Sequence, residues 1–414
     1  MPRTSWLYST GKGCHNNMNA NPYLKPLKAF DPVKNLSINE SFSSGRVESG
    51  SDTLSDLQSR ESTVTNDSGQ EFCQIKTGGP IVSGIEIVNN GDSGPALLVG
   101  NKSGEIYILR PTEQTFTVLS RMKIQGSIIN TPSYQNGIIY CTTQEGIAYA
   151  IKTDISSSSK EVKPKILWQK KFNKGILTEP LTTGKLLIIA TLRGLFCFEA
   201  YYQDESNKSI GKLLWKYELE GIVSTPRIDS GIIFIASEDK QINAFDYGGN
   251  KISKLWSYKL SDAARTKACV SSMKNLVLVP TIDGFIYALD RTSGEFRWNF
   301  VVRSRILSPI VSAVQGNDEY FYFGADNGKF YCINAMGKQV WSFQGRGKIR
   351  SEALVDQDRV YFGSEDNMLY ALNRTTGSPV FTFKTDGNIN GRPLVIDRVI
   401  YFGSSDSFVH GVHL

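Results

Sequence analysis

A short β-meander that recurs along the chain is the feature that most limits its fold. The clearest copy has a strand at residues 285–290, turn residues at 290–294 and a further strand that begins at Arg297. An Asp-Gly pair at 283–284 joins the first of these strands to an apolar segment at 276–280, which is typical of a tight hairpin. The pattern therefore predicts three consecutive antiparallel strands.

Eight copies of this meander follow one another at intervals of 40 to 52 residues. Each copy is expected to open with a short strand that contains proline or a small residue. These marker residues are Pro80, Pro132, Pro180, Pro226, Ala268, Pro309, Ala353 and Pro393. The second and third strands are apolar, and in six copies an aromatic residue marks the fourth. These aromatic residues are Trp168, Trp215, Trp256, Trp298, Trp341 and Phe381. The period is typical of a four-stranded propeller blade.

The last copy ends at Leu414 after only three strands. A strand-like segment at residues 71–76 precedes the first copy, as residues 380–384 precede the last marker. Pairing of this segment with the last copy would supply the missing strand and remove exposed sheet edges, whereas an open solenoid would explain neither feature. The sequence therefore predicts an all-β protein. We expect residues 71–414 to form an eight-bladed β-propeller of four-stranded antiparallel blades, with the last blade closed by an N-terminal strand.

Residues 1–70 have a different composition from the repeats, rich in Ser, Asn, Glu and Asp with few bulky apolar side chains. Such a segment buries too little surface to offset its ordering entropy, so we expect a disordered or weakly ordered arm, or the remnant of a connection to another domain. The chain shows no apolar run typical of a signal peptide or a membrane helix. We therefore expect a cytoplasmic protein without a membrane span, or an extracytoplasmic one if a leader precedes Met1.

The best-preserved repeats resemble those of a known family. The residues that carry the resemblance are Ala288–Asp290, Thr292–Gly294 and Trp298, and Ala371–Asn373, Thr376–Gly377 and Phe381. They are similar to the repeat of the pyrroloquinoline-quinone, or quinoprotein, propeller superfamily. This superfamily includes quinone-dependent dehydrogenases, outer-membrane assembly proteins of the BamB type and cofactor-free propellers attached to other enzymes. The chain also looks similar to the propeller that ends the β-alanine-activating, adenylate-forming enzymes, but it contains no adenylation domain.

The resemblance implies an enzymatic alternative, a quinone-dependent alcohol or sugar dehydrogenase. In that class the quinone lies in the central channel with a calcium ion, near a disulfide between adjacent cysteines and a catalytic aspartate. The six cysteines of this chain are scattered, with no adjacent pair and no haem-attachment motif. We therefore expect no cofactor, and an extracytoplasmic assembly factor of the BamB type is the other alternative.

Cysteine and histidine positions are explained by the repeat rather than by chemistry. Cys197 and Cys332 occupy a position that alanine holds in other copies, and Cys141 and Cys269 fall within strands, so packing is the expected role. His410 stands where other copies have tyrosine. No catalytic triad or zinc site is predicted.

Acidic residues recur in the turn between the second and third strands. They are Glu145, Asp239, Asp283, Asp326, Asp366 and Asp406. A ring of carboxylates is a candidate metal site, but recurrence at one structural position favours capping of the turn backbone.

Basic residues gather in the loops that connect consecutive blades near the channel mouth. The candidate partner-binding residues are Arg265, Lys267, Arg303, Arg305, Arg346, Lys348, Arg350 and Arg392. Focused positive charge would attract a protein with an acidic segment or another anionic ligand. Lysine and arginine exceed the acids by only six, 46 against 40, which does not favour nucleic acid. The opposing interpretation is that nearby turn acids neutralise these charges.

The leading functional prediction is a non-catalytic propeller scaffold for protein interaction or anionic-ligand binding through this basic channel mouth. As an accessory domain it would position a substrate or carrier for a larger, acyl-activating enzyme system. Two longer insertions, at 153–165 and 201–212, are expected on the opposite face, where added length costs little.

Overall fold

The structure is a computed structural model that describes residues 69–88, 94–112, 115–153, 163–173, 175–200, 211–222, 224–248 and 251–414. Residues 67–414 form one compact unit. The predicted arm lies outside the described residues except for Gly69 and Gln70, as do most residues of both insertions. Within the described part, no helix is long and apolar enough to cross a membrane.

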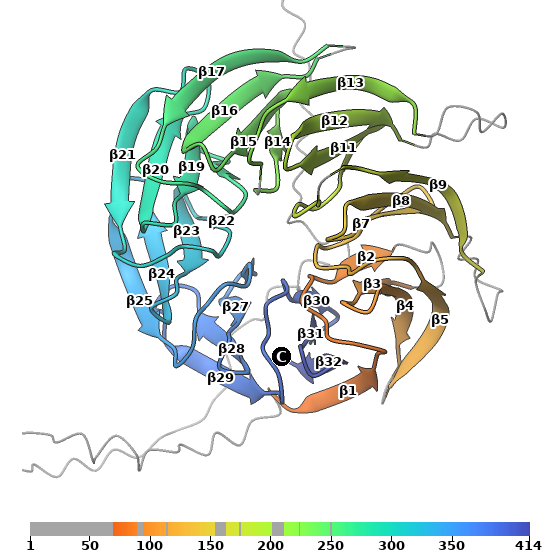
Figure 1. The fold of residues 1–414 in the computed structure, drawn as a ribbon. Helices are drawn as coiled ribbons and strands as arrows, with labels where there is room; N and C mark the ends of the chain where they lie inside the picture. The colour runs from red at the N-terminus through yellow and green to blue at the C-terminus, as the bar shows by residue number, and fades with distance from the viewer. Residues whose placement is uncertain are drawn as a thin grey trace, which may run out of the picture. The chain divides into compact units, whose positions relative to one another are not determined.

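Eight four-stranded antiparallel sheets follow one another around a ring, as predicted (Figure 1). Blade 1 contains β2 (Glu86–Val88), β3 (Ala96–Gly100), β4 (Glu105–Pro111) and β5 (Phe116–Lys123). Blade 2 contains β6 (Ser133–Gln135), β7 (Ile138–Thr142), β8 (Ile147–Lys152) and β9 (Lys165–Lys171). Blade 3 contains β10 (Leu181–Thr183), β11 (Leu186–Thr191), β12 (Gly194–Glu199) and β13 (Leu213–Glu218). Blade 4 contains β14 (Arg227–Asp229), β15 (Ile232–Ala236), β16 (Gln241–Asp246) and β17 (Ser253–Lys259).

The second half of the ring repeats this order of strands. Blade 5 contains β18 (Cys269–Val270), β19 (Leu276–Pro280), β20 (Phe285–Asp290) and β21 (Phe296–Val301). Blade 6 contains β22 (Val311–Gln315), β23 (Asp318–Gly324), β24 (Lys329–Asn334) and β25 (Gln339–Gln344). Blade 7 contains β26 (Leu354–Val355), β27 (Arg359–Gly363), β28 (Met368–Asn373) and β29 (Pro379–Lys384). Blade 8 contains β30 (Leu394–Ile396), β31 (Val399–Gly403) and β32 (Phe408–His413), and takes its fourth strand from β1 (Glu71–Lys76).

The first strand of each blade borders the central channel and the fourth lies at the outer edge (Figure 1). Strand β1 pairs antiparallel with β32, with Cys73 opposite Gly411 and Lys76 opposite Phe408. The predicted closure of the last blade by an N-terminal strand is therefore confirmed.

Seven of the eight marker residues lie one or two residues before a first strand rather than within it, and Pro80 lies six residues before β2, so this detail of the prediction was wrong. Pro180 precedes β10, Pro226 precedes β14 and Pro393 precedes β30. Proline cannot donate an N–H to a ladder, so it starts a short strand more readily than it continues one.

Hydrophobic side chains fill the spaces between neighbouring blades. The middle strands are buried on both faces: every residue of β3, β7 and β19 is buried. Between blades 1 and 2, for example, Leu98 and Ile108 pack in one cluster with Ile139 and Tyr149. Each fully buried aliphatic side chain contributes roughly 1.5–3 kcal/mol, so the interfaces between blades dominate the stability of the ring.

The recurring tryptophan lies opposite the small residue of the third strand. Ala288 pairs with Trp298, and Cys332 pairs with Trp341. Cys141, Cys197, Cys269 and Cys332 are free and buried, which confirms the packing role predicted for these four, and Cys73 is free and buried as well. Trp298 also contacts the next blade, because its Nε1 donates a hydrogen bond to the Ala335 carbonyl at 3.1 Å.

Candidate functional site

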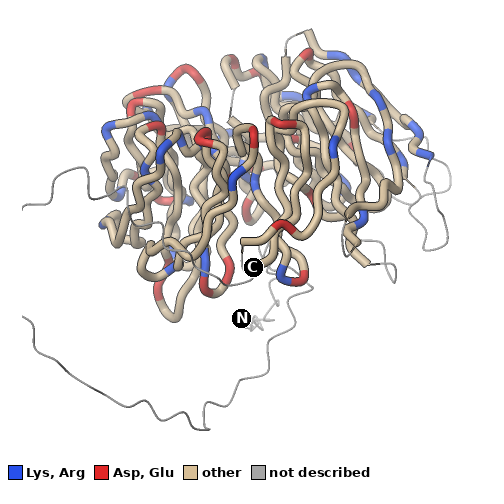
Figure 2. Tube along the Cα trace, turned by 90° about the horizontal axis from the view of Figure 1, so that it is seen from below, with Lys and Arg blue, Asp and Glu red and all other residues tan. Residues whose placement is uncertain are grey.

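The loops between consecutive blades and the turns between second and third strands lie on one face of the ring, because the strands of each blade alternate in direction. We call this the connector face. Seen from the side, basic and acidic residues are interspersed along the ring (Figure 2). The eight basic residues predicted to bind a partner lie in these connecting loops, but the structure places them in three different environments.

Two of the eight are paired with acids of the neighbouring turns. Arg265 Nε lies 2.7 Å from Glu238 Oε1. Arg350 binds Asp326 through two nitrogens, at 2.7 and 2.8 Å, and lies 3.0 Å from Glu365 Oε1. For Arg265 and Arg350, neutralisation by nearby turn acids was therefore the better interpretation.

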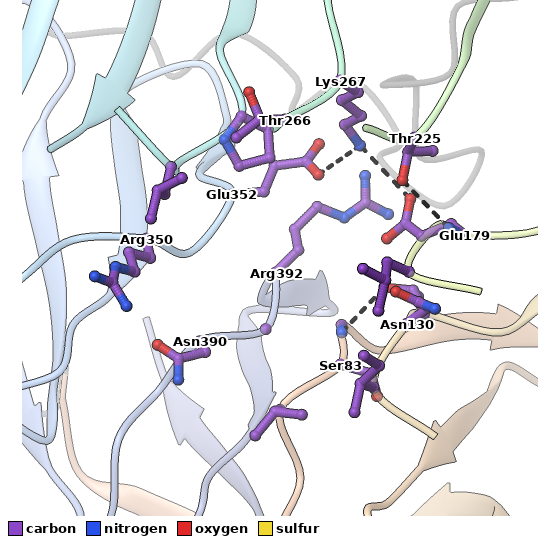
Figure 3. A pocket seen from close by; sticks show the side chains of 18 of the residues that line it. Ser83, Asn130, Glu179, Thr225, Thr266, Lys267, Arg350, Glu352, Asn390 and Arg392 are labelled. Carbon is purple, nitrogen blue, oxygen red and sulfur yellow. Dashed lines mark hydrogen bonds and ion pairs between the residues drawn. The ribbon is translucent and has the colours of Figure 1, made fainter. Parts of the chain in front are cut away.

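Two more of the eight, Lys267 and Arg392, line a cavity of about 260 Å³ at the connector end of the ring. The paired residues Arg265 and Arg350 also contribute to its lining. Side chains from different blades converge there, whereas Arg350 points away from them (Figure 3). Six of the eight residues that directly precede a marker proline or alanine reach this cavity. Those that line it are Thr131, Glu179, Thr225, Lys267, Glu352 and Arg392.

The remaining four, Arg303, Arg305, Arg346 and Lys348, are exposed. None of them forms an ion pair with another described residue. Their loops are held by backbone hydrogen bonds, because the carbonyls of Arg305 and Lys348 accept from the N–H groups of Asp326 and Glu365, both at 2.9 Å. These four residues form a cluster over blades 5 to 7 that we call the exposed basic cluster.

Opposite charges are grouped in the cavity. Lys267 Nζ lies 2.5 Å from Glu352 Oε2 and 4.0 Å from Glu179 Oε2 (Figure 3). Burial opposes ionisation of Glu352, but the positive charges of Lys267 and Arg392 outweigh it and hold its pKa below the ordinary value. Glu86 behaves in the opposite way, because burial raises its pKa despite the nearby charge of Arg392.

Arg392 has a different environment from Lys267. Burial opposes its charge, yet the carboxylates of Glu352, Glu86 and Glu179 hold its pKa above the ordinary value. No carboxylate of the described residues lies within ion-pair distance, 4.0 Å, of its guanidinium. Two neighbouring lining residues, Thr266 and Asn390, have buried side-chain oxygens without a hydrogen-bond partner in the described structure. The cavity is thus polar and incompletely satisfied.

The recurrent turn acids act mainly on the backbone. Asp239, Asp366 and Asp406 each accept a hydrogen bond from the N–H two residues further on, at 2.9 to 3.2 Å. Asp326 differs, because its carboxylate binds Arg350 instead. Across the described residues, no group of three or more His, Cys, Asp or Glu side chains has a geometry suited to a metal ion.

Sequence reasoning missed Glu179 and Glu352, the acids that line the cavity, and Glu86, whose charge acts on Arg392. A signal for two of them was present, since Glu179 and Glu352 stand at the same repeat position as Lys267 and Arg392. That position, one residue before the marker, faces the channel. Glu86 lies in β2 and has no such signal.

Comparisons with known proteins agree with the fold. A family model described as outer membrane protein assembly factor BamB matches residues 165–335 and 283–414, more than half of the chain. Among solved structures, BamB from Moraxella catarrhalis has a TM-score of 0.61 at 16% identity and covers 83% of this chain and 97% of its own. Sqt1 from Saccharomyces cerevisiae has a TM-score of 0.69 at 11% identity, covering 84% and 99%. A europium-containing methanol dehydrogenase has a TM-score of 0.62 at 13% identity, covering 83% and 93%.

These identities establish similarity of fold alone. The chain matches none of the curated proteins.

Proposed function

Because the chain belongs to the propeller family described as outer membrane protein assembly factor BamB, we propose that it is a non-catalytic scaffold that binds another protein. The partner contributes an acidic segment, which lies across the connector face. The exposed basic cluster of Arg303, Arg305, Arg346 and Lys348 receives this segment.

The single observation that carries the proposal is that these four cations form no ion pair with the described residues, whereas the neighbouring Arg350 does. Arg350 has its charge satisfied by Asp326 and Glu365. Arg303 and Arg305 lie in the preceding connecting loop, are exposed and have no such partner among the described residues. Cations that the fold leaves unpaired, on loops that it fixes by backbone hydrogen bonds, support a role in binding an external anion.

The binding energy comes from several modest charge contacts on a rigid surface. Each exposed ion pair contributes roughly 0.5–1 kcal/mol, so three reversed charges weaken an acidic ligand about 10- to 100-fold. Exposed charges are screened by salt, so the affinity falls as ionic strength rises.

A direct test uses an immobilised ten-residue peptide rich in Asp and Glu, with binding of the full chain measured at 50 and 300 mM salt. The triple variant Arg303→Glu, Arg305→Glu, Lys348→Glu is expected to lose at least tenfold in affinity and most of the salt dependence. The matched control is Lys212→Glu, Lys251→Glu, Lys338→Glu, which makes the same charge change at exposed positions of the opposite face. Equal losses in both triples, or retained binding in the first, would contradict the proposal.

A further inference from the structure

We propose that the central cavity binds a small zwitterion of the amino-acid type, with its carboxylate on Arg392 and its ammonium group on Glu179. This site is separate from the exposed basic cluster and goes beyond the scaffold function. It rests on four observations: two charged groups without close partners, the balance of charge around them, the size of the space and its unsatisfied polar lining.

The first observation is the environment of Arg392. Its guanidinium enters the cavity from the loop before β30 and points toward Glu179 and Lys267 (Figure 3). It makes no hydrogen bond or ion pair with the described residues, although its planar fork carries five N–H donors. A guanidinium prefers the bidentate geometry of a carboxylate, so the fork is available to one supplied by a ligand.

The second observation is the complementary environment of Glu179. Its backbone N–H is fixed by a hydrogen bond to Thr225 Oγ1 at 3.2 Å. Among the described residues, Lys267 is the only cation within ion-pair distance of its carboxylate, and it lies at the 4.0 Å limit. Lys267 is held much closer to Glu352, at 2.5 Å. The Glu179 oxygens can therefore accept hydrogen bonds from an ammonium group.

The charge balance around these two residues selects the ligand class. The cavity is lined by two acids, Glu179 and Glu352, and by two cations that are not paired outside it, Lys267 and Arg392. Arg265 and Arg350 also line it, but their charges are paired with Glu238 and Asp326. A simple anion bound to Arg392 would be repelled by the two carboxylates, and a simple cation bound to Glu179 would be repelled by the two basic groups. A ligand that carries both charges satisfies both residues and leaves the cavity neutral.

The size and polarity of the cavity limit the ligand further. A volume of about 260 Å³ is below that of typical drug-sized pockets, so the ligand is a small molecule. Thr266 is more than nine-tenths buried, and its hydroxyl has no partner in the described structure. Equivalent hydroxyls two residues before the marker, on Thr178, Ser224 and Ser351, donate to carbonyls of their own second strands at 2.7 to 2.8 Å. Thr266 departs from this pattern beside the cavity.

Isothermal titration calorimetry on the full chain tests the proposal with glycine, L-alanine, L-serine and 4-aminobutyrate. Acetate and ethylamine serve as single-charge controls. At least one zwitterion is expected to bind, with acetate and ethylamine at least about tenfold weaker. The proposal is overturned if none of the four zwitterions binds at 10 mM, or if acetate binds as tightly as the best of them.

Variants then identify the residues. Glu179→Gln removes the negative charge at a partly exposed side chain and is expected to weaken the zwitterion at least about tenfold, as is Arg392→Met. Because Arg392→Met leaves buried acids uncompensated, the conservative Glu179→Gln decides the outcome if the other variant does not fold. Arg193→Met, at an exposed position in the turn between β11 and β12 on the same face, is the matched control and should bind normally. Unchanged affinity in Glu179→Gln would refute the assignment.

The same titration separates this proposal from the scaffold function. The triple variant at Arg303, Arg305 and Lys348 is expected to keep zwitterion binding while it loses the acidic peptide. If the cluster variant loses only the peptide and the cavity variants lose only the zwitterion, the two sites are independent. Absence of peptide binding by the unmodified chain would refute only the scaffold proposal, and absence of zwitterion binding would refute only the cavity proposal.

Discussion

The contact between the recurring tryptophan and a glycine of the next blade gives a prediction whose size follows from the structure. Gly337 lies in the turn between β24 and β25 of blade 6, with φ of 73°. A Cβ added there would lie 2.6 Å from Trp298 Cε3 and 2.8 Å from Cδ2, both from blade 5. Gly294 and Gly377 have the same relation to Trp256 and Trp341. We expect Gly337→Ala to loosen the interface between blades 5 and 6.

Three costs contribute to the predicted loss of stability. A side chain at positive φ costs about 1 kcal/mol. Displacement of a packed ring typically costs about 1–3 kcal/mol, and loss of the hydrogen bond from Trp298 to the Ala335 carbonyl costs about 1 kcal/mol more. The free energy of unfolding should therefore fall by roughly 3–5 kcal/mol.

Gly316→Ala is the matched control, because Gly316 has φ of 61° in the same blade and nothing lies within 4 Å of an added Cβ. Urea unfolding of both variants should give a loss of about 1 kcal/mol for Gly316→Ala and at least twice that for Gly337→Ala. Equal losses would refute the reasoning, since only the backbone cost would then be present.

Two further predictions concern charge. Burial opposes ionisation of Glu105, but hydrogen bonds from Arg121, Asn101 and Tyr107 lower its pKa to about 2. The stabilisation is present above the unfolded pKa near 4.5 and lost as pH falls toward 2, so Glu105→Gln should remove up to about 3 kcal/mol of the pH dependence of unfolding in that window. An unchanged profile would contradict this assignment. Asp326→Asn should leave Arg350 paired with Glu365 alone and remove one negative charge beside the exposed basic cluster, so the acidic peptide should bind about two- to fivefold more tightly in the same assay. Unchanged or weaker binding would count against a peptide site on this face.

The fold could be predicted from the sequence because each blade repeats the same local signals. The closing strand was found from two independent facts, the truncated last copy and the unassigned segment at residues 71–76. Its partner Gly411 now lies opposite Cys73, where other blades have alanine opposite tryptophan. Strand boundaries near the markers were less predictable, since proline fixes where a strand can begin rather than its extent.

The candidate site was only partly predictable, because ion pairing depends on contacts between blades. Arg265 and Arg303 look alike in the sequence, since both lie in connecting loops before a marker. Arg265 meets Glu238 from the preceding turn, while Arg303 has no acid within reach among the described residues. The partner-binding role of the eight basic residues remains a prediction. Glu179 and Glu352 would have been found by aligning the residue before each marker.

Closure of the ring by β1 is the claim on which the fold and the central cavity depend, because it brings blade 8 and Arg392 beside blade 1. A Cβ at Gly411 would lie 2.7 Å from Cys73 Sγ, so Gly411→Cys places two sulfurs within disulfide reach. Burial raises the pKa of Cys73 to about 12, so the variant is oxidised while it refolds. Gly411→Ser measures the cost of contact with Tyr401, 2.9 Å from the same Cβ.

The decisive measurement is the melting temperature of Gly411→Cys before and after reduction, together with its mobility on a non-reducing gel. A closed loop of roughly 340 residues would stabilise the protein by up to about 6 kcal/mol. The account predicts an intramolecular disulfide, faster migration and a higher melting temperature for the oxidised form. A variant that forms only intermolecular disulfides, or none, would show that β1 does not close the ring.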